Sequence, residues 1–420
     1  MAISNATHPT IAIIGAGPGG LLAARVLQQG GLAPRIYDAD GSVSSRNPGG
    51  TLDLHADSGQ IAIDDAGLTD RFAELARPEG QAKRLVDPVS GALLKEFGAE
   101  PGVFAAPEID RGQLREMLAD SVDPASIRWQ HKLVEFDPAS AGGGQMWFAN
   151  GAVEHADIVI GADGSWSRVR PALTPARPRY TGVSFVELAF SDVDRKHPGV
   201  SKLVGDGHLW ANGDGQNLIL QRNSGGVVRG YLGMRIELDW LAREGLGAPD
   251  GHGGVELNAN GVHALDTDKV REVLLERFAS FAPQLRSVIV ESEGVFANRP
   301  IFALPAPLRW EHRSGVSLIG DAAHVMSPFG GNGVNFALLD AAEIARAILA
   351  SVRSGGDVDQ AIREYELTMF ARTGEVAVRA NAAIADHYKA GGMDIDDIPD
   401  FVEEHDRWNA NAVAYRSARD

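Results

Sequence analysis

TIAIIGAGPGG, residues 10–20, decides the fold of this chain of 420 residues. Its first part is a short apolar run, which is typical of a buried strand in a parallel sheet. Three glycines follow in the spacing G-x-G-x-x-G, and residues 21–29 are rich in Leu, Ala and Gln, which favour a helix. A strand, a glycine turn and a helix in this order predict a dinucleotide-binding unit, and the alternative is a tight turn in an ordinary α/β protein.

Each glycine of this turn has a physical role at its position. Gly15 permits the tight turn, Gly17 lets the backbone approach a pyrophosphate, and Gly20 lets the helix pack closely on the strand. The pyrophosphate would lie at the helix N-terminus, where free N–H groups and the helix dipole favour an anion. Asp38 ends the next expected strand, close to the spacing of about 20 residues at which an acid binds the ribose.

The composition excludes several classes of protein. The chain has no cysteine, which rules out disulfides, thiolate zinc sites, iron–sulfur clusters and cysteine nucleophiles. Its net charge of −17 is opposite in sign to that of most proteins that bind nucleic acid or an anionic membrane surface. The first ten residues contain no Lys or Arg, and no apolar run is long enough to span a membrane. We therefore expect a cytoplasmic protein with neither nucleic acid nor membrane as its partner.

Two later segments indicate which dinucleotide is bound. The first is GADGSWSRVR, residues 161–170, which follows an expected buried strand. The second is GDAAHVMSPFGGNGVN, residues 320–335, which leads into an expected strong helix. In their order and spacing, these segments and the first glycine turn resemble the motifs of the flavoprotein aromatic hydroxylases, the single-component class A FAD monooxygenases.

The resemblance narrows to one branch of that family, the tetracycline-inactivating monooxygenases or tetracycline destructases. The segments that carry it are GGTLDLH at 49–55, SGQ at 58–60 and PEIDR at 107–111, followed by Leu114 and Arg115. The similarity is dense up to residue 170 and again over 298–350, and it is thin in between. It implies non-covalent FAD held by Gly15, Gly17, Pro18, Gly20, Asp38, Arg46, Asp53, Arg111, Asp163, Gly320, Asp321, Pro328, Gly331, Gly333 and Asn335.

The substrate side departs from the family pattern. The drug-contacting Gln and Arg of the family align with Glu187 and His208, so both polar contacts to the drug have changed character. From the residues alone, these two side chains have the alternative interpretation of solvent-exposed groups. The predicted substrate-binding residues are Glu187, His208, Trp210, Phe185, Phe329 and Gly330.

The resemblance implies an NADPH- and O2-dependent hydroxylation. In the family, NADPH reduces FAD, and O2 then gives a flavin C4a-hydroperoxide whose distal oxygen goes to an electron-rich carbon of an enol or phenol. We expect no catalytic side chain, because the flavin carries the chemistry, and no metal, because no H-E-x-x-H or clustered His/Asp spacing is present. The helix that begins near Val334 would direct its N-terminus at the flavin and favour negative charge there.

The expected architecture is α/β, with a Rossmann-like FAD-binding domain of the para-hydroxybenzoate hydroxylase type. It comprises residues 1–70, 100–176 and 298–355. An inserted α+β substrate domain, residues 71–99 and 177–297, is expected to be built on an antiparallel sheet, although 71–100 reads as irregular. The remainder, 356–420, is expected to hold a long helix over 359–389 and an acidic tail, residues 394–406, that is solvated and partly flexible.

The leading hypothesis is a monomeric enzyme that hydroxylates, and so inactivates, a tetracycline or a related phenolic or enolic polycycle. One alternative is a hydroxylase of another aromatic or polyketide substrate in biosynthesis or catabolism. Another, of a different class, is a flavoprotein that sequesters a drug without turnover. The complete GDAAH segment, residues 320–324, speaks against the last, because a mere binder would not need the ribityl site.

Overall fold

The computed structural model describes residues 8–45, 49–98, 104–246, 267–389 and 401–418. A five-stranded parallel sheet lies at the centre of the FAD-binding part, with the strand order β17-β11-β1-β2-β7. Short runs of Ile and Val form its middle strands and are almost fully buried, as in sheets covered on both faces. The strands are β1 (Ile11–Ile14), β2 (Arg35–Tyr37), β7 (Ile127–Arg128), β11 (Ile158–Gly161) and β17 (Val316–Leu318).

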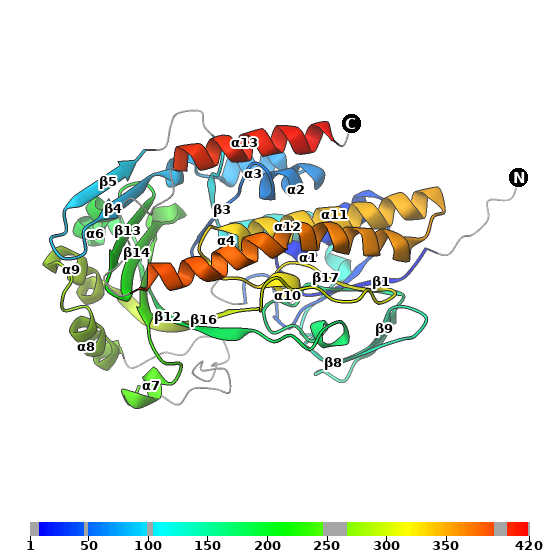
Figure 1. Ribbon diagram of the computed structural model, residues 1–420, viewed down its shortest axis with the longest axis horizontal. Coiled ribbons are helices and arrows are strands. Elements are labelled where there is room, and N and C mark those ends of the chain that lie inside the picture. The colour runs from blue at the N-terminus through cyan, green and yellow to red at the C-terminus, as the bar shows by residue number, and fades with distance from the viewer. Residues whose placement is uncertain (1–7, 46–48, 99–103, 247–266, 390–400, 419–420) are drawn as a thin grey trace, which may run out of the picture.

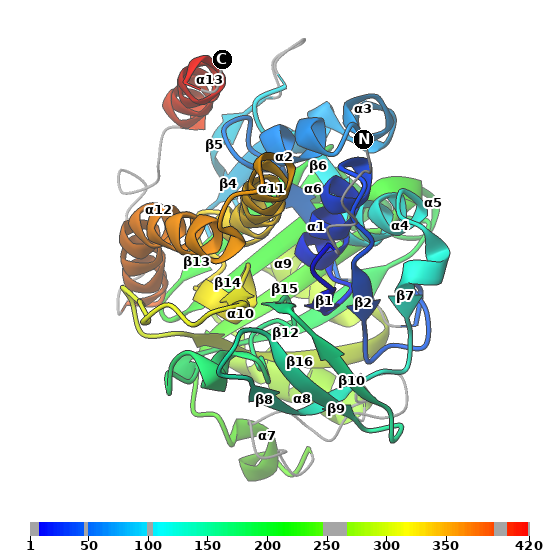
Figure 2. The ribbon, with the colours of Figure 1, turned by 90° about the vertical axis from the view of Figure 1, so that its right-hand side faces the viewer.

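Long helices cover one face of this sheet and a small antiparallel sheet covers the other (Figure 2). Their apolar side chains join the strands in one large core. The helices are α1 (Pro18–Gln29), α4 (Arg111–Asp120), α11 (Asn332–Ser354) and α12 (Val358–His387), and the small sheet comprises β8 (Leu133–Pro138), β9 (Gly144–Phe148) and β10 (Val153–Ala156).

A seven-stranded sheet forms the second part of the molecule, with the order β16-β12-β15-β14-β13-β4-β5. All its pairs are antiparallel except β13 with β4. Its outer face packs on short helices in a separate apolar core, and its inner face turns toward the FAD-binding part (Figure 1). The strands are β4 (Lys83–Val86), β5 (Leu93–Phe97), β12 (Arg179–Phe190), β13 (His208–Gly213), β14 (Gln216–Arg222), β15 (Val228–Arg235) and β16 (Glu293–Ala303).

The remaining elements are short and connect or cover the two sheets. Those beside the FAD-binding part are β3 (Thr51–Asp53), β6 (Glu108–Asp110), α2 (Gly59–Asp65), α3 (Thr69–Leu75) and α10 (Asp321–His324). Those on the outer face of the large sheet are α5 (Val193–Lys196), α6 (Pro198–Val204), α7 (Trp240–Arg243), α8 (Thr267–Arg277) and α9 (Pro283–Glu291). No helix in the described ranges is both long and apolar enough to cross a membrane.

The predicted α/β class and the antiparallel sheet of the second part are confirmed, whereas the expected irregular stretch at 71–100 is wrong. It contains the end of α3 and the β4–β5 hairpin, which extends the large sheet. Asp87 makes the hairpin turn, since its carboxylate accepts the backbone N–H groups of Val89 and Ser90. The exact domain boundaries stay a prediction.

The described part of the expected acidic tail, residues 401–406, is half-buried or exposed and begins a helix. Residues Phe401–Ser417 form a helix, α13, whose apolar side chains pack against α2 and α11. Trp408 on this helix is buried and stacks on the imidazole of His55, with 3.8 Å between the ring centroids. Tertiary packing therefore orders a segment whose charge pattern alone is typical of a solvated chain. The part of the predicted tail at 394–400 lies outside the described residues.

Candidate flavin and substrate site

The glycine turn after β1 leaves open space where a pyrophosphate would pass. Gly15 has φ +112°, and a Cβ there would collide with the carbonyl oxygen of Ala162. A Cβ on Gly20 would collide with the carbonyl oxygen of Gly15. At Gly17, by contrast, no atom lies within 4 Å of the position a Cβ would take. Gly15 and Gly20 are thus required for folding, whereas the space at Gly17, at the N-terminus of α1, remains available to a ligand.

Asp38 is held against this turn rather than exposed to solvent. Its side chain is 6% exposed, and its Oδ2 accepts the backbone N–H of Ala16 at 2.6 Å. Arg115 from α4 supports the arrangement, since its Nε donates to the carbonyl oxygen of Ala16 and its Nη2 lies 2.8 Å from Asp40. The sequence comparison included Arg115 in a matching segment but assigned it no role. Its position on α4 makes it the residue that joins the turn to the end of β2.

The two flavin motifs at the ends of β11 and β17 are tied together by Arg170. This buried guanidinium donates to the carbonyl oxygens of Ser165 and Ala322, one from each motif. Burial raises the pKa of Asp163, whose Oδ2 accepts the N–H of Arg168 at 2.6 Å. The carboxylate of Asp321 is exposed at the start of α10 and lies 3.3 Å from the hydroxyl of Ser165. It is therefore accessible to the hydroxyl groups of a ribityl chain.

Gly320 is held from behind by a buried ionic network. Its N–H donates to Asp340 on α11, and the same carboxylate binds His324 at 2.6 Å and Arg372 at 2.7 Å. Burial opposes ionisation of Asp340, but His324 and Arg372 outweigh it and hold its pKa below the usual value. Sequence analysis missed this network, because its members come from three separate elements.

Asp53 and Arg111 lie beside the start of α11. Asp53 lies next to Gly331, since a Cβ on Gly331 would be 2.8 Å from the Oδ1 of Asp53. The Oδ2 of Asp53 lies 3.4 Å from the Nε2 of His55. Although burial opposes its ionisation, the neighbouring His55 lowers the pKa of Asp53. Arg111 is exposed and makes no side-chain hydrogen bond or ion pair with any residue in the described ranges. A guanidinium in this state is available to flavin or ribityl oxygens; Arg46 lies outside the described residues.

Asn335 is fully buried and links the segment around Asp53 to helix α11. Its Oδ1 accepts the N–H of His55 at 2.8 Å, and its Nδ2 donates to the carbonyl oxygens of Asp53 and Gly331, each at 2.9 Å. Gly331 has φ +64° and caps the helix, and no atom lies within 4 Å of a Cβ placed on Gly333. The N-terminus of α11 is therefore held in place by Asn335, and the position beside Gly333 is open.

Three predicted substrate residues meet on the inner face of the large sheet. Phe185 on β12 belongs to one apolar cluster with Phe329, and Trp210 on β13 packs against it with 6.4 Å between the ring centroids of Trp210 and Phe329. Tyr388 and His387, at the end of α12, complete the cluster. Sequence analysis missed both, because only the fold brings the end of α12 to this sheet. Pro328 and Gly330 flank Phe329 and are exposed.

Glu187 and His208 are buried, so the alternative interpretation of solvent exposure is wrong for both. Glu187 is 4% exposed and binds Arg229 at 2.7 Å and Arg299 at 2.8 Å. His208 is 5% exposed, and its Nε2 lies 2.9 Å from Glu108 on β6. Strand register places both side chains on the inner face of the large sheet. Their ionic partners there offset the loss of hydration that burial imposes on a charged group. Their contact with a substrate stays a prediction.

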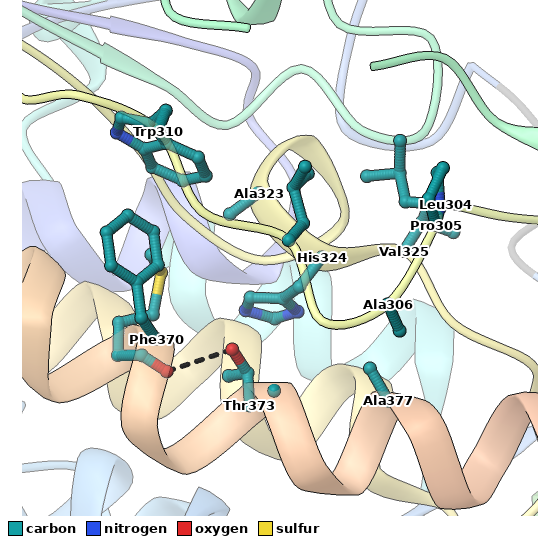
Figure 3. A pocket seen from close by; sticks show the side chains of 13 residues that line it. Leu304, Pro305, Ala306, Trp310, Ala323, His324, Val325, Phe370, Thr373 and Ala377 are labelled. Carbon is teal, nitrogen blue, oxygen red and sulfur yellow. Dashed lines mark hydrogen bonds between the residues drawn. The ribbon is translucent and has the colours of Figure 1, made fainter.

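A small cavity lies behind the flavin motif, between α12 and the segment 304–310 (Figure 3). Its volume is about 10 Å³, room for one water molecule at most. Apolar side chains and His324 surround it, so it suits neither a flavin nor a substrate. Within the described residues, no group of three or more His, Cys, Asp or Glu side chains is arranged to hold a metal ion.

Comparison with known proteins agrees with this geometry. A family model described as an FAD binding domain matches residues 8–228 and 309–378. Monooxygenase asqM of Emericella nidulans is 30% identical over 415 residues, which cover 86% of this chain and 91% of that protein.

Two solved structures share the fold at low sequence identity. Klebsiella pneumoniae HpxO complexed with FAD and uric acid superposes with a TM-score of 0.72 at 22% identity and covers 96% of this chain and 92% of that one. Tetracycline destructase Tet(55) gives a TM-score of 0.64 at 18% identity and covers 96% of each chain. The domain match and the fungal relative show that this chain belongs to the family of FAD-dependent monooxygenases of the aromatic hydroxylase type, whose fold it shares.

Proposed function

We propose that this monooxygenase hydroxylates a tetracycline or a related phenolic or enolic polycycle, with NADPH and O2 as co-substrates. When bound, FAD would pass the reducing equivalents of NADPH to O2 and so supply the activated oxygen for the reaction. The observation that carries the proposal is the cluster of Phe185, Trp210 and Phe329 on the inner face of the large sheet. Phe329 lies directly before the glycines that cap α11, so a planar substrate on this cluster would lie beside the flavin space.

The chain's own residues provide the environment for this chemistry. The aromatic side chains exclude water from the reacting groups, which protects a reactive oxygen donor. The N-terminus of α11 favours negative charge on a reduced flavin, since Gly331 and Gly333 leave its first N–H groups accessible. Arg229 and Arg299 carry two positive charges against the single negative charge of Glu187. The net positive charge of this group suits a substrate with acidic oxygen atoms.

A second candidate is the hydroxylation of a different aromatic compound on the same scaffold. The named relatives favour it, since they include a fungal monooxygenase and a urate hydroxylase of Klebsiella pneumoniae. The altered contacts at Glu187 and His208 also favour it, because both side chains are engaged by ionic partners.

A panel of compounds in an assay of NADPH consumption separates these candidates. If tetracyclines accelerate NADPH and O2 consumption, and the product gains the mass of one oxygen atom, the first proposal holds. If only simple phenols, urate or other polyketides do so, the second holds. A yellow, flavin-loaded protein that consumes NADPH with none of them would instead be a flavoprotein that sequesters its ligand.

A further inference from the structure

The face of α13 that meets the rest of the molecule carries a titratable side chain in the middle of an aromatic and apolar stripe. The residues of this stripe, which recur at helical spacing and so lie on one side of the helix, are Phe401, His405, Trp408 and Ala412. Trp408 and Ala412 are buried, and the other two are half-buried. An imidazole therefore occupies a position where a docked amphipathic helix ordinarily has an apolar side chain.

The stripe rests on side chains from two other parts of the chain. The ammonium group of Lys83 on β4 lies 3.9 Å from the ring centroid of Phe401. At the other end, Trp408 stacks on His55, with 3.8 Å between the ring centroids. Along the helix, His405 lies between these two contacts, and its ring centroid is 5.5 Å from that of Trp408. His405 therefore belongs to the contact that holds α13 in place.

The surroundings disfavour a proton on this imidazole while α13 is docked. Burial lowers the pKa of His405, and positive charge on Lys83 and on His55 lowers it further. Asp53, beside His55, and Asp406, on α13 itself, act in the opposite direction without cancelling these effects. The docked helix thus favours the neutral ring.

The other charged groups at this contact leave the imidazole without a counter-charge. Glu404 pairs with Arg407 at 3.2 Å on the same helix, and Asp57 accepts a hydrogen bond from the amide of Asn411 at 3.0 Å. Lys95 on β5 adds a further positive charge near the start of α13. Within the ranges that the structure describes, no carboxylate forms an ion pair with this imidazole. A protonated ring would therefore gain by moving into water.

We propose that acid releases α13: a proton on His405 undocks the helix and uncovers His55 and the apolar cluster beneath Trp408. In the released helix the ring is hydrated and titrates near its ordinary pKa of 6.5. Because the docked ring has a lower pKa, docking is strongest above this value and weakens as the pH falls through it toward the docked pKa.

Release would act at the edge of the predicted flavin site. His55 lies 3.4 Å from Asp53, a predicted flavin contact, and its backbone N–H is held by Asn335 at the start of α11. The release depends on the contacts of α13 and not on which compound the enzyme oxidises. The proposed function can therefore fail while this proposal holds, and the reverse is also true.

Hydrogen exchange of residues 401–417 in the flavin-loaded full chain measures docking, once the rates are corrected for the intrinsic effect of pH. Between about pH 7.5 and about pH 5.5, we expect the protection of these amides to fall about 5-fold in the wild type, within the limit of about 10-fold per pH unit for one proton. His405→Phe retains an aromatic ring but cannot titrate, so its protection should change by less than about 1.5-fold. The matched control is His131→Phe, because His131 is also half-buried but packs on Tyr37 in the FAD-binding part. It should keep the wild-type response.

Two further variants separate the charge of the imidazole from its packing. His405→Gln is neutral and polar, and it should also abolish the pH response. Lys83→Met keeps an unbranched side chain against Phe401 but removes the positive charge, so the pKa of His405 should rise and the response should shrink to about 2-fold. Titration of His405 followed by NMR in the wild type should give a pKa below 6.5, and in Lys83→Met a higher one.

Four results would overturn the proposal. They are protection of residues 401–417 that does not change with pH in the wild type, a wild-type response in both His405→Phe and His405→Gln, loss of the response in His131→Phe, and a pKa of His405 at or above 6.5. An equal fall in protection at residues 11–14 of the central sheet would also refute it, because acid would then unfold the whole molecule. If neither variant of His405 docks at neutral pH, the NMR titration decides: an unchanged pKa in Lys83→Met counts against the proposal, and a raised one supports it.

Discussion

At the scale of single residues, the glycines of the flavin site divide into two kinds. At Gly15 the backbone has a positive φ and a side chain would meet a carbonyl oxygen, so folding itself requires glycine. At Gly17 the backbone is extended, with φ −77°, and the space beside it is open. We therefore propose that the requirement for glycine at Gly17 comes from the ligand, because a pyrophosphate would need the space that a Cβ would occupy.

This division predicts opposite effects of two alanine substitutions. Gly17→Ala should fold with a melting temperature close to that of the flavin-free wild type but should bind FAD at least 10-fold more weakly, a loss of about 1.4 kcal/mol. Gly15→Ala should lower the melting temperature of the flavin-free protein, because its backbone conformation is strained for an L-residue. Thermal unfolding and FAD titration measure both effects, and full FAD affinity in folded Gly17→Ala would contradict this account of the turn.

At the scale of elements, the flavin motif after β17 depends on two long helices behind it. Asp340 on α11 holds the N–H of Gly320 and also binds Arg372 on α12. Because its carboxylate is fully buried, its charge persists only through these partners. The geometry of a cofactor motif is thus maintained by residues that do not touch the cofactor space.

Asp340→Asn should lower the free energy of unfolding at pH 7 by about 3 kcal/mol, because it removes a negative charge that offsets the positive charge of the buried Arg372. The pKa of Asp340 is lower in the folded protein, so its contribution is present above the unfolded pKa and is lost as the pH falls through the folded value. The variant should therefore lose less stability than the wild type on acidification below about pH 4. Denaturant unfolding across pH measures this, with Glu364→Gln on the exposed face of α12 as the control; parallel pH profiles would refute it.

Helix α13 illustrates packing that dominates over local sequence preference. Trp408 contributes a stack on His55 and an apolar cluster with Ile61 and Leu339. Trp408→Ala should destabilise the docked helix by about 3 kcal/mol, in the range for large core truncations. Hydrogen exchange of residues 401–417 should become faster, whereas Val413→Ala, at an exposed position, should leave it unchanged. Equal exchange in both variants would show that Trp408 does not hold the helix.

At the scale of the whole molecule, polar contacts join the large sheet to the β3–β6 pair beside the proposed substrate face. Arg77 binds Asp110 on β6 at 3.2 Å and also donates to the carbonyl oxygen of Arg222 on β14. His208 and Glu108 form a second connection. Since Asp110 directly precedes Arg111, these contacts link the proposed substrate face to the proposed flavin contact.

The bound cofactor should accordingly stabilise the whole molecule. Removing FAD should lower the melting temperature, and adding it back at 100 times its Kd should restore about 2.7 kcal/mol by mass action. Differential scanning calorimetry with and without FAD tests this, and Gly17→Ala should show little restoration at the same FAD concentration. An equal melting temperature for wild type with and without FAD would contradict the assigned site.

The sequence by itself determined the parts of this protein that depend on local rules. The spacing of glycines after β1 predicts the α/β class and a bound dinucleotide, because a turn of this kind is specified by adjacent residues. The motifs at residues 161–170 and 320–335 identify the dinucleotide as FAD through their resemblance to a known family. Only the tertiary structure decided the pairing of β4 with β13, the ion pairs of Glu187, the docking of α13 and the position of His387. Each of these depends on contacts between segments far apart in the chain, which neither periodicity nor local propensity encodes.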